Sequence, residues 1–275
     1  MAELVGVFAA SHTPVMLNFP DAIPDQERTA VFSAFQSLGA ALRGCRPDVV
    51  VVISDDHLHN FFLDNFPAFC IGAAPQYATP IEHWLKAPKS VLPGDTALGA
   101  YLLQEALAAD FDPAFSMDLT LEHGVLTPLE LAGITSEVRV VPIMINCVQP
   151  PFPSMRRCLQ WGHFLGDTIA SYPREARIAV LATGGLSHDI ATPRMGLGNE
   201  DFDRRFLDLL ASGDDDALVR YATDHVHDAG NGAEEIRTWL LAHGAARGGR
   251  FATQYYKAVG NWYTGIGIGT WDVGT

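Results

Sequence analysis

The sequence predicts an α/β fold, a single three-layer domain in which a mixed sheet is flanked by helices. Short apolar runs rich in β-branched residues alternate with longer segments whose apolar residues recur at helical spacing. That order is typical of strands joined by helices, with at least part of the sheet parallel. No stretch rich in Pro, Gly or Ser divides the chain, so we expect one domain over residues 1–275.

The predicted strands are short and apolar. The second reads DVVVVI, and because it is apolar throughout we expect it to be buried on both faces. The aromatic and glycine-rich tail from 255 to 271 is expected to return to the sheet as strands. In chain order, the predicted strands before this tail are Leu4–Ala10, Asp48–Ile53 (the DVVVVI run), Phe69–Ile71, Val138–Ile145 and Arg177–Leu181.

The segments between these runs have the spacing of amphipathic helices. In the first of them the apolar side chains of Val31, Phe35, Leu38 and Leu42 fall on one face. The segment after residue 200 has room for one or two helices before the last one begins. The predicted helices are Asp25–Arg43, Gly94–Ala109, Met155–Ser171, Phe202–Tyr221 and Ala233–Ala245.

Charge and composition exclude several classes of protein. The formal net charge is −14, so neither nucleic acid nor an anionic membrane is the expected partner. No apolar run reaches the roughly 18 residues that a membrane span needs. The start, Met1 to Ala10, lacks the basic segment of a signal peptide. The four cysteines show no paired spacing, which favours a reducing compartment, so we expect a cytoplasmic protein.

Three histidines follow directly after predicted strands. LVGVFAA leads into Ser11-His12, DVVVVI leads into a polar turn ending in His57, and RIAVLA leads into GGLS and His188. Ligands of open α/β sheets bind at the carboxyl ends of the strands, so these imidazoles are expected to converge on one active site there. Imidazoles alone do not select the metal. The lack of nearby cysteine disfavours a structural zinc site.

A metal site of this kind also needs a carboxylate, and the residues leave several candidates. Asp55 and Asp56 lie beside His57, where Asp56 is also a candidate for orienting an imidazole. Glu234 and Glu235 lie in the first turn of the last predicted helix, where acids also interact favourably with the helix dipole. Helical periodicity does not decide between these two glutamates.

Five segments together resemble the class III extradiol ring-cleaving dioxygenases. This family includes the catalytic subunit of protocatechuate 4,5-dioxygenase and the 2,3-dihydroxyphenylpropionate dioxygenases. The likeness covers nearly the whole chain, and its segments occur in the family's order. They are Ser11-His12-Thr13-Pro14, Asp56-His57, Glu122-His123-Gly124, Gly184-Gly185-Leu186-Ser187-His188 and Glu235-Ile236-Arg237-Thr238-Trp239.

The resemblance implies a function and a set of site residues. It implies Fe(II)- and O2-dependent extradiol cleavage of a catecholic ring to a ring-opened semialdehyde or keto acid. His12, His57 and Glu235 match the family's iron ligands, with Glu235 in the place before Ile-x-x-Trp. His188 matches the catalytic histidine that takes the second phenolic proton, and His123 matches a second catalytic histidine that hydrogen-bonds substrate or oxygen.

The resemblance says less about the substrate and the assembly. Lys257 and Asn261 fall where related enzymes contact ring substituents, but Gly260 stands where the family often has Ser. The segment 193–197 resembles the protocatechuate branch, whereas Phe61-Phe62 resembles the phenylpropionate branch, so both branches stay open. The family also implies a homo-oligomer, or a complex with a separate small helical subunit.

Two alternatives belong to other functional classes. The same histidines and aspartates would serve a hydrolase that uses a zinc-bound water. A binding protein that keeps the fold without oxygenase chemistry is the second alternative. The presence of all three expected ligands together with His188 favours the dioxygenase over both.

Overall fold

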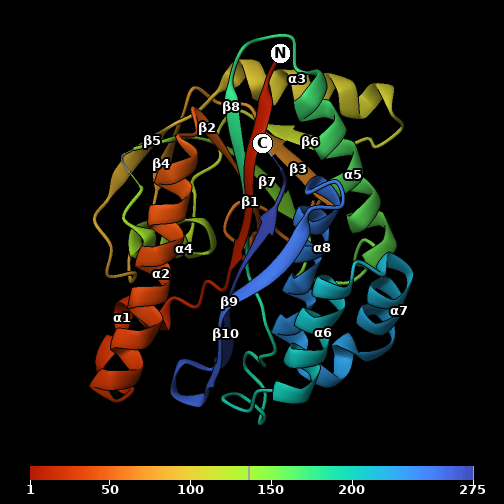
Figure 1. Ribbon diagram of the computed structural model, residues 1–275. Coiled ribbons are helices and arrows are strands. Elements are labelled where there is room, and N and C mark those ends of the chain that lie inside the picture. The colour runs from red at the N-terminus through yellow and green to blue at the C-terminus, as the bar shows by residue number, and fades with distance from the viewer. Residues whose placement is uncertain (136, 275) are drawn as a thin grey trace.

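A computed structural model describes residues 1–135 and 137–274 of the chain. Its framework is an eight-stranded sheet with the order β6-β3-β7-β2-β8-β1-β10-β9, accompanied by a small two-stranded sheet of β4 and β5 (Figure 1). The strands are β1 (Glu3–Ala10), β2 (Val49–Asp55), β3 (Phe69–Gly72), β4 (Gln76–Thr79), β5 (Ser90–Pro93), β6 (Ala114–Ser116), β7 (Arg139–Ile145), β8 (Arg177–Thr183), β9 (Arg250–Val259) and β10 (Thr264–Asp272).

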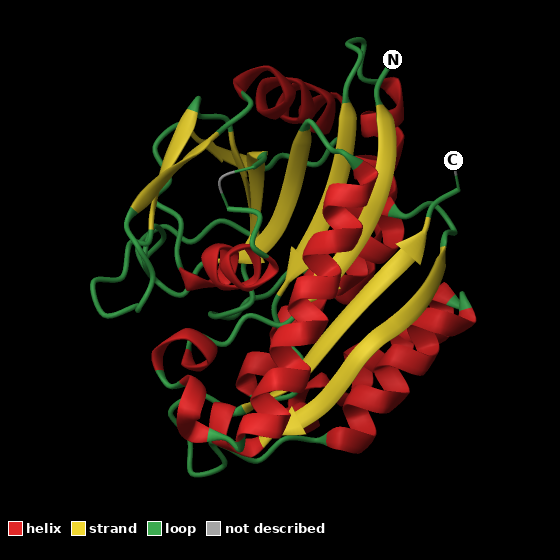
Figure 2. Cartoon of the chain, turned by 60° about the vertical axis from the view of Figure 1, so that its left-hand side comes forward, coloured by secondary structure: helices red, strands yellow, loops and turns green. Residues whose placement is uncertain are grey.

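Helices cover both faces of the large sheet (Figure 2). They are α1 (Val15–Asn18), α2 (Asp25–Cys45), α3 (Thr96–Ala108), α4 (His123–Ala132), α5 (Met155–Ser171), α6 (Glu200–Ser212), α7 (Asp215–His225) and α8 (Ile236–Ala245). Short 3-10 turns are η1 (Pro20–Ala22), η2 (Val226–Ala229), η3 (Asn231–Glu235) and η4 (Gly260–Trp262). In the described residues no helix combines the length and the apolar character that crossing a membrane requires.

The alternation of side chains along β2 explains the three layers. Val49, Val51 and Ile53 pack with α3, α5 and α8 on one face, whereas Val50 and Val52 pack with α2 and α4 on the other. All seven residues of β2 are buried, because a central parallel strand is covered on both faces. The predicted α/β architecture with a mixed sheet between helices is confirmed.

The central strands β7, β2, β8 and β1 are parallel to one another, and the outer pairs are partly antiparallel. The carboxyl ends of β1, β2 and β8 therefore lie side by side at one edge of the sheet. The register places Ala10 opposite Thr183 and Ile53 opposite Ala182. The segments that follow these three strands must start within a few ångströms of one another.

The sequence patterns did not predict every element. The segment 202–221 forms two helices, α6 and α7, separated at Gly213, which has a φ of +69°. Helix α4 was not predicted, because nine of its ten residues are buried and it has no polar face to give a helical period. The short strands β4, β5 and β6 were also not predicted.

Candidate active site

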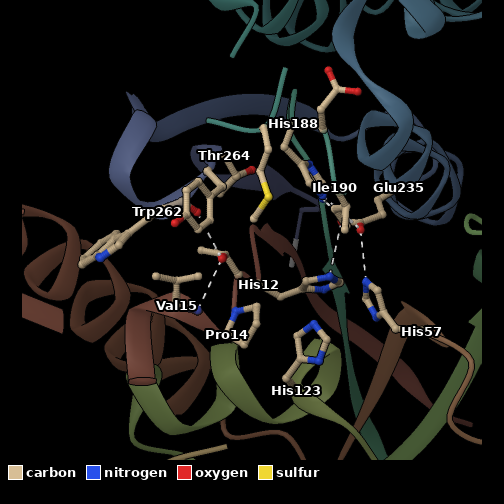
Figure 3. A pocket seen from close by; sticks show the side chains of 15 residues that line it. His12, Pro14, Val15, His57, His123, His188, Ile190, Glu235, Trp262 and Thr264 are labelled. Atoms are coloured by element: carbon tan, nitrogen blue, oxygen red, sulfur yellow. Dashed lines mark hydrogen bonds and ion pairs between the residues drawn. The ribbon is translucent and has the colours of Figure 1, made fainter. Parts of the chain in front are cut away.

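The segments after β1, β2 and β8 bring His12, His57 and His188 to one place. The imidazole centroids of His12 and His57 are 5.3 Å apart, and a third ring, that of His123 on α4, lies 4.4 Å from His57. His188 Nε2 lies 3.5 Å from the carboxylate of Glu235. Residues from five distant parts of the chain thus form one cluster at the strand ends (Figure 3).

The cluster opens into a cavity of about 220 Å³. Most drug-sized ligands occupy pockets of roughly 300–1,000 Å³, so this volume suits a single aromatic ring. The lining residues are His12, Thr13, Pro14, Val15, His57, His123, Gly185, His188, Asp189, Ile190, Met195, Glu235, Trp262, Tyr263 and Thr264.

Glu235 is the carboxylate on which the imidazoles converge. Its Oε2 lies 3.3 Å from His12 Nε2, and its Oε1 lies 3.4 Å from His57 Nε2. One nitrogen or oxygen atom from each of His12, Asp55, His57 and Glu235 lies within 4.8 Å of the others. These are donor atoms of the type that divalent iron or zinc takes in proteins.

The structure also shows why the neighbouring Glu234 does not belong to the site. Glu235 lies at the end of η3, immediately before α8, and its Oε2 accepts a hydrogen bond of 2.6 Å from the backbone N–H of Gly185. Glu234 instead forms an ion pair with Arg237. The expected helical first turn is therefore a 3-10 turn, and it directs only Glu235 into the cavity.

Asp55, which the sequence left among the candidates, lies fully buried behind the cluster. Its carboxylate oxygens are 3.8 Å from His12 Nε2 and 3.6 Å from His57 Nε2, and neither oxygen has a hydrogen-bond partner in the described structure. Burial raises the pKa of Asp55 to about 7. Both ring nitrogens of His12 are likewise buried without hydrogen bonds.

These unsatisfied atoms test whether a metal fits. Buried polar atoms without partners are costly, and a cation placed between two imidazoles and two carboxylates would satisfy His12 Nε2 and the carboxylate of Asp55. Burial alone would lower the pKa of His57, but the negative charges of Asp55 and Glu122 outweigh it and raise that pKa well above its usual value. The donor set and its negative field therefore fit a divalent cation.

Glu122, not Asp56, orients His57. Glu122 Oε1 lies 2.7 Å from His57 Nδ1, and its Oε2 accepts the backbone N–H of His57. Asp56 instead accepts the backbone N–H groups of the turn that follows, from His59 to Phe61. Of the two possibilities that the sequence left for Asp56, orienting an imidazole or forming a turn, the structure shows the turn.

Each residue of the Glu122-His123-Gly124 segment has a distinct role. Glu122 fixes the ring of His57, which directs Nε2 of that ring toward Glu235. His123 begins α4 and lines the cavity. A Cβ at Gly124 would lie 2.7 Å from Glu122 Oε1 and 2.8 Å from Ser54 Oγ, so the close approach of the helix to the cluster requires glycine.

His123 is held in turn by Glu82, a residue that the sequence did not reveal. Glu82 Oε1 accepts the backbone N–H of His123 at 2.9 Å and lies 2.6 Å from its Nδ1. His59, two residues after His57, lies 3.5 Å from Glu82 and 3.7 Å from Glu122 through its Nε2. A second group of His59, Glu82, Glu122 and His123 therefore borders the first.

His188 is positioned by the loop that contains it. Its Nδ1 lies 2.8 Å from the carbonyl oxygen of Leu186, which can only accept, so Nδ1 carries the proton and Nε2 is free. Asp203 accepts hydrogen bonds from both the backbone N–H and the hydroxyl of Ser187. A Cβ at Gly232 would lie 2.0 Å from His188 Nε2, so that glycine leaves room for the ring.

The glycines before His188 connect this loop to α8. Gly184 has a φ of +128°, and a Cβ there would lie 3.0 Å from Cβ of Glu235. Its carbonyl accepts a hydrogen bond of 2.9 Å from Trp239 Nε1 on α8. The GGLSH segment and the segment starting at Glu235 are therefore parts of one hydrogen-bonded unit.

Two expected substrate-binding residues lie elsewhere. Lys257 on β9 forms an ion pair of 3.0 Å with Glu27, and Asn261 donates a hydrogen bond of 2.8 Å to the carbonyl of Ala22. Neither is among the described residues that line the cavity. The tail contributes Trp262, Tyr263 and Thr264 instead, because η4 turns Asn261 toward η1.

Comparison with known protein families establishes the family to which the chain belongs. Residues 6–267 match the family described as the catalytic LigB subunit of aromatic ring-opening dioxygenase. The chain belongs to this family. The match covers all the segments that form the cavity, so the resemblance noted in the sequence is confirmed.

Relatives in this family bear names of ring-cleaving enzymes. A protein of Cupriavidus necator named 2,3-dihydroxyphenylpropionate/2,3-dihydroxicinnamic acid 1,2-dioxygenase is 31% identical over 93% of this chain and 94% of the relative. A protein of the same name from Burkholderia vietnamiensis is 33% identical over 80% of this chain and 83% of the relative. One from a Rhodococcus species is 28% identical over 97% and 98%.

A solved structure shares the fold. An uncharacterized protein of Escherichia coli K12 superposes with a TM-score of 0.60 at 14% identity, over 96% of this chain and 99% of that one. Membership of the LigB family implies a metal, and the group of His12, Asp55, His57 and Glu235 offers it a suitable site.

Proposed function

We propose that this LigB-family protein is an Fe(II)- and O2-dependent extradiol dioxygenase that cleaves a catecholic ring beside its two hydroxyl groups. The observation that carries the proposal is the buried group of two imidazoles and one carboxylate with a third imidazole, that of His188, at its edge. The names of the relatives support the same reaction class.

In this proposal His12, His57 and Glu235 hold the iron. Two neutral imidazoles and one carboxylate are the donor set of the non-haem ferrous oxygenases, which leaves positions for substrate and oxygen. When bound, the iron supplies chelation of the diol and activation of O2. The protein contributes by presenting Nε2 of both histidines to Glu235, since Glu122 holds the opposite nitrogen of His57.

His188 is the proposed proton-transfer residue. Its Nδ1 is committed to the carbonyl of Leu186, so Nε2 is the atom that accepts a proton from the second phenolic hydroxyl and later returns it. Nε2 lies 3.5 Å from Glu235 Oε1, which places it beside the expected position of the diol. The loop anchored on Asp203 keeps the ring in place during both transfers.

His123 is the proposed second catalytic histidine. Glu82 holds its Nδ1, so its Nε2 is the atom available to hydrogen-bond the diol or oxygen in the cavity. Val15 and Trp262 lie on the side of the cavity away from His57 and Glu235, and Pro14 lies beside His12 and His123 (Figure 3). These apolar side chains exclude water from the reacting ring.

Metal dependence and O2 consumption distinguish this proposal from the two alternatives, a zinc hydrolase and a binding protein. A zinc hydrolase would be active with Zn(II) and indifferent to O2, whereas the dioxygenase needs Fe(II) and consumes O2. A binding protein would take up a catechol without consuming O2. Family membership and the retention of His188 in the cavity support the dioxygenase.

The test is turnover of catechols by protein loaded anoxically with Fe(II) and then exposed to air, with oxygen uptake and yellow ring-fission products as readouts. The variant His188→Phe should retain its iron and lose about 100-fold or more in kcat, because a positioned general base contributes roughly that much. His227→Phe is the control, since His227 is exposed on the surface. Undiminished turnover by iron-loaded His188→Phe would show that His188 is not the base.

A further inference from the structure

The cavity has two chemically different ends. The imidazoles and Glu235 lie together at one end, and the apolar side chains of Val15 and Trp262 lie at the other (Figure 3). The remaining apolar lining residues are Pro14, beside His12 and His123, Ile190, beside His188 and Glu235, and Met195. A diol held beside Glu235 must direct its ring substituents toward this second, apolar end. The residues there therefore decide which substituents are accepted.

Among the described residues, no Lys or Arg lines the cavity. Arg194, next to the lining residue Met195, is already paired with Asp189 at 3.1 Å and donates to the carbonyl of Asp228. Lys257 is paired with Glu27. Besides Glu235, the charged side chain that lines the cavity is the carboxylate of Asp189.

The backbone also has few donors to offer at this end. The N–H groups of Ile190, Met195 and Tyr263 are donated to Asn231, to the carbonyl of Thr192 and to the carbonyl of Gly260. The hydroxyl of Thr13 is donated to the carbonyl of Trp262. Two lining side chains offer uncharged hydroxyls: Tyr263, and Thr264, whose buried Oγ1 has no partner in the described structure.

A carboxylate on the substrate would be poorly compensated here. An anion that leaves bulk water needs a cation or several hydrogen bonds, and the two hydroxyls of Tyr263 and Thr264 supply at most two. Glu235 already places a negative carboxylate in the cavity, and Arg194, a cation beside the lining, is committed to Asp189. A divalent metal is offset by Glu235 and by the ionised diol, so it does not balance a further anion.

We propose that the substrate is a catechol whose ring substituent is uncharged and largely apolar, with the hydroxyls of Tyr263 and Thr264 as the uncharged polar contacts offered to it. The proposal rests on the proposed function and narrows its substrate class. It separates this chain from its relatives in Cupriavidus necator and Burkholderia vietnamiensis, whose names specify carboxylated diols.

The decisive comparison uses two diols of nearly equal shape, 3-propylcatechol and 2,3-dihydroxyphenylpropionate. The Fe(II)-loaded enzyme should bind 3-propylcatechol at least tenfold more tightly in anoxic calorimetry and show at least a tenfold higher kcat/KM under air. Equal or tighter binding of the carboxylate would overturn the proposal. If the enzyme binds the diols but cleaves neither, the proposed function is refuted, and the ratio of the two affinities still decides the charge preference. If it binds neither diol, both the proposed function and the proposed substrate class are overturned.

Charge variants test the physical cause. Met195→Lys places a cation at the apolar end and should shift the binding ratio at least tenfold toward the carboxylate, whereas Met195→Leu should keep the preference for 3-propylcatechol. Ile190→Lys provides a second position, and both side chains are partly exposed, 44% and 45%. Unchanged ratios in both lysine variants would show that charge does not set the preference.

Discussion

At the scale of single residues, the pair of Glu82 and His123 shows how one carboxylate prepares an imidazole. Glu82 is 3% exposed, and its Oε1 contacts both the backbone N–H and Nδ1 of His123. Burial alone would raise the pKa of Glu82, but the hydrogen bonds from His123 outweigh it and keep that pKa below its usual value. The ionised carboxylate can only accept, so Nδ1 keeps its proton and Nε2 faces the cavity.

We expect Glu82 to act as a positioning residue. In Glu82→Gln one acceptor oxygen remains, so kcat should fall about tenfold, equivalent to ~1.4 kcal/mol of transition-state stabilisation. In Glu82→Ala no acceptor remains, and the loss should be larger. KM should change little in both variants. Steady-state rates measured over a range of diol concentrations, up to saturation, would give kcat and KM separately.

The iron content distinguishes positioning from general damage. Glu82 contacts His123 and His59 but none of the three proposed ligands, so both variants should bind iron as the parent does. Glu175→Gln, on the exposed surface, is the control for loss of a carboxylate. A loss of iron that parallels the loss of kcat would contradict the positioning role.

At the scale of elements, the contact between α5 and α8 fixes the position of Glu235. A Cβ at Gly162 would lie 2.1 Å from the carbonyl oxygen of Leu241, and one at Gly244 would lie 2.4 Å from that of Leu159. The two helices therefore touch through their backbones. Because α8 follows Glu235 directly, and Trp239 on it binds the carbonyl of Gly184, any displacement of α8 moves the site.

A methyl group at this contact should damage both stability and site. Gly162→Ala forces α5 and α8 apart, and overpacking of this kind costs about 1–3 kcal/mol. We expect a lower midpoint in urea and weaker binding of Fe(II), both from the same displacement. Urea titrations with and without iron would measure the two effects.

Gly44 supplies the matched control, because it lies in α2 and a Cβ there would meet nothing within 4 Å. Gly44→Ala should stabilise the protein by about 0.5–1 kcal/mol, since alanine loses less conformational freedom than glycine in a helix. Stability of Gly162→Ala equal to that of the parent would mean that the helices adjust without cost.

At the scale of the whole molecule, the site gathers several ionisable side chains that the fold holds out of water. Asp55, Glu122 and Glu235 are all buried, and the described residues offer them imidazoles but no Lys or Arg. Burial would raise the pKa of Glu122, but His57 and His123 hold it near 2, so this carboxylate is ionised. Desolvated charge of this kind is costly for the fold without a bound cation.

Metal binding should therefore stabilise the entire fold. At a free Fe(II) concentration 100 times Kd, binding to the native state alone contributes about 2.7 kcal/mol, because a ligand that binds only the folded protein shifts unfolding by mass action. For a chain of this size that corresponds to an increase in Tm of about 5–10 °C. Anoxic calorimetry of Fe(II)-loaded and chelator-treated protein would measure the difference.

His12→Ala removes one proposed ligand and should abolish most of this increase, whereas Met195→Leu, away from the ligands, should retain it. An increase in Tm that persists in His12→Ala would place the metal elsewhere.

Much of the architecture was readable from local patterns. The DVVVVI run predicted a strand buried on both faces, and the structure buries all seven residues of β2. The helices α2 and α5 lie where the apolar spacing placed them. Such patterns predict elements because burial of one face requires apolar residues at the spacing of a helix or a strand, and that spacing is visible among residues close in sequence.

The chain by itself thus determined the α/β order and placed histidines at the ends of three neighbouring strands. Only the tertiary structure decided what holds them: Glu82 reaches His123 across 41 residues, and Glu122 reaches His57 across 65. It also decided that Asp56 stabilises a turn and that Lys257 and Asn261 lie outside the cavity. Contacts between distant residues depend on how elements pack, and no local period records them.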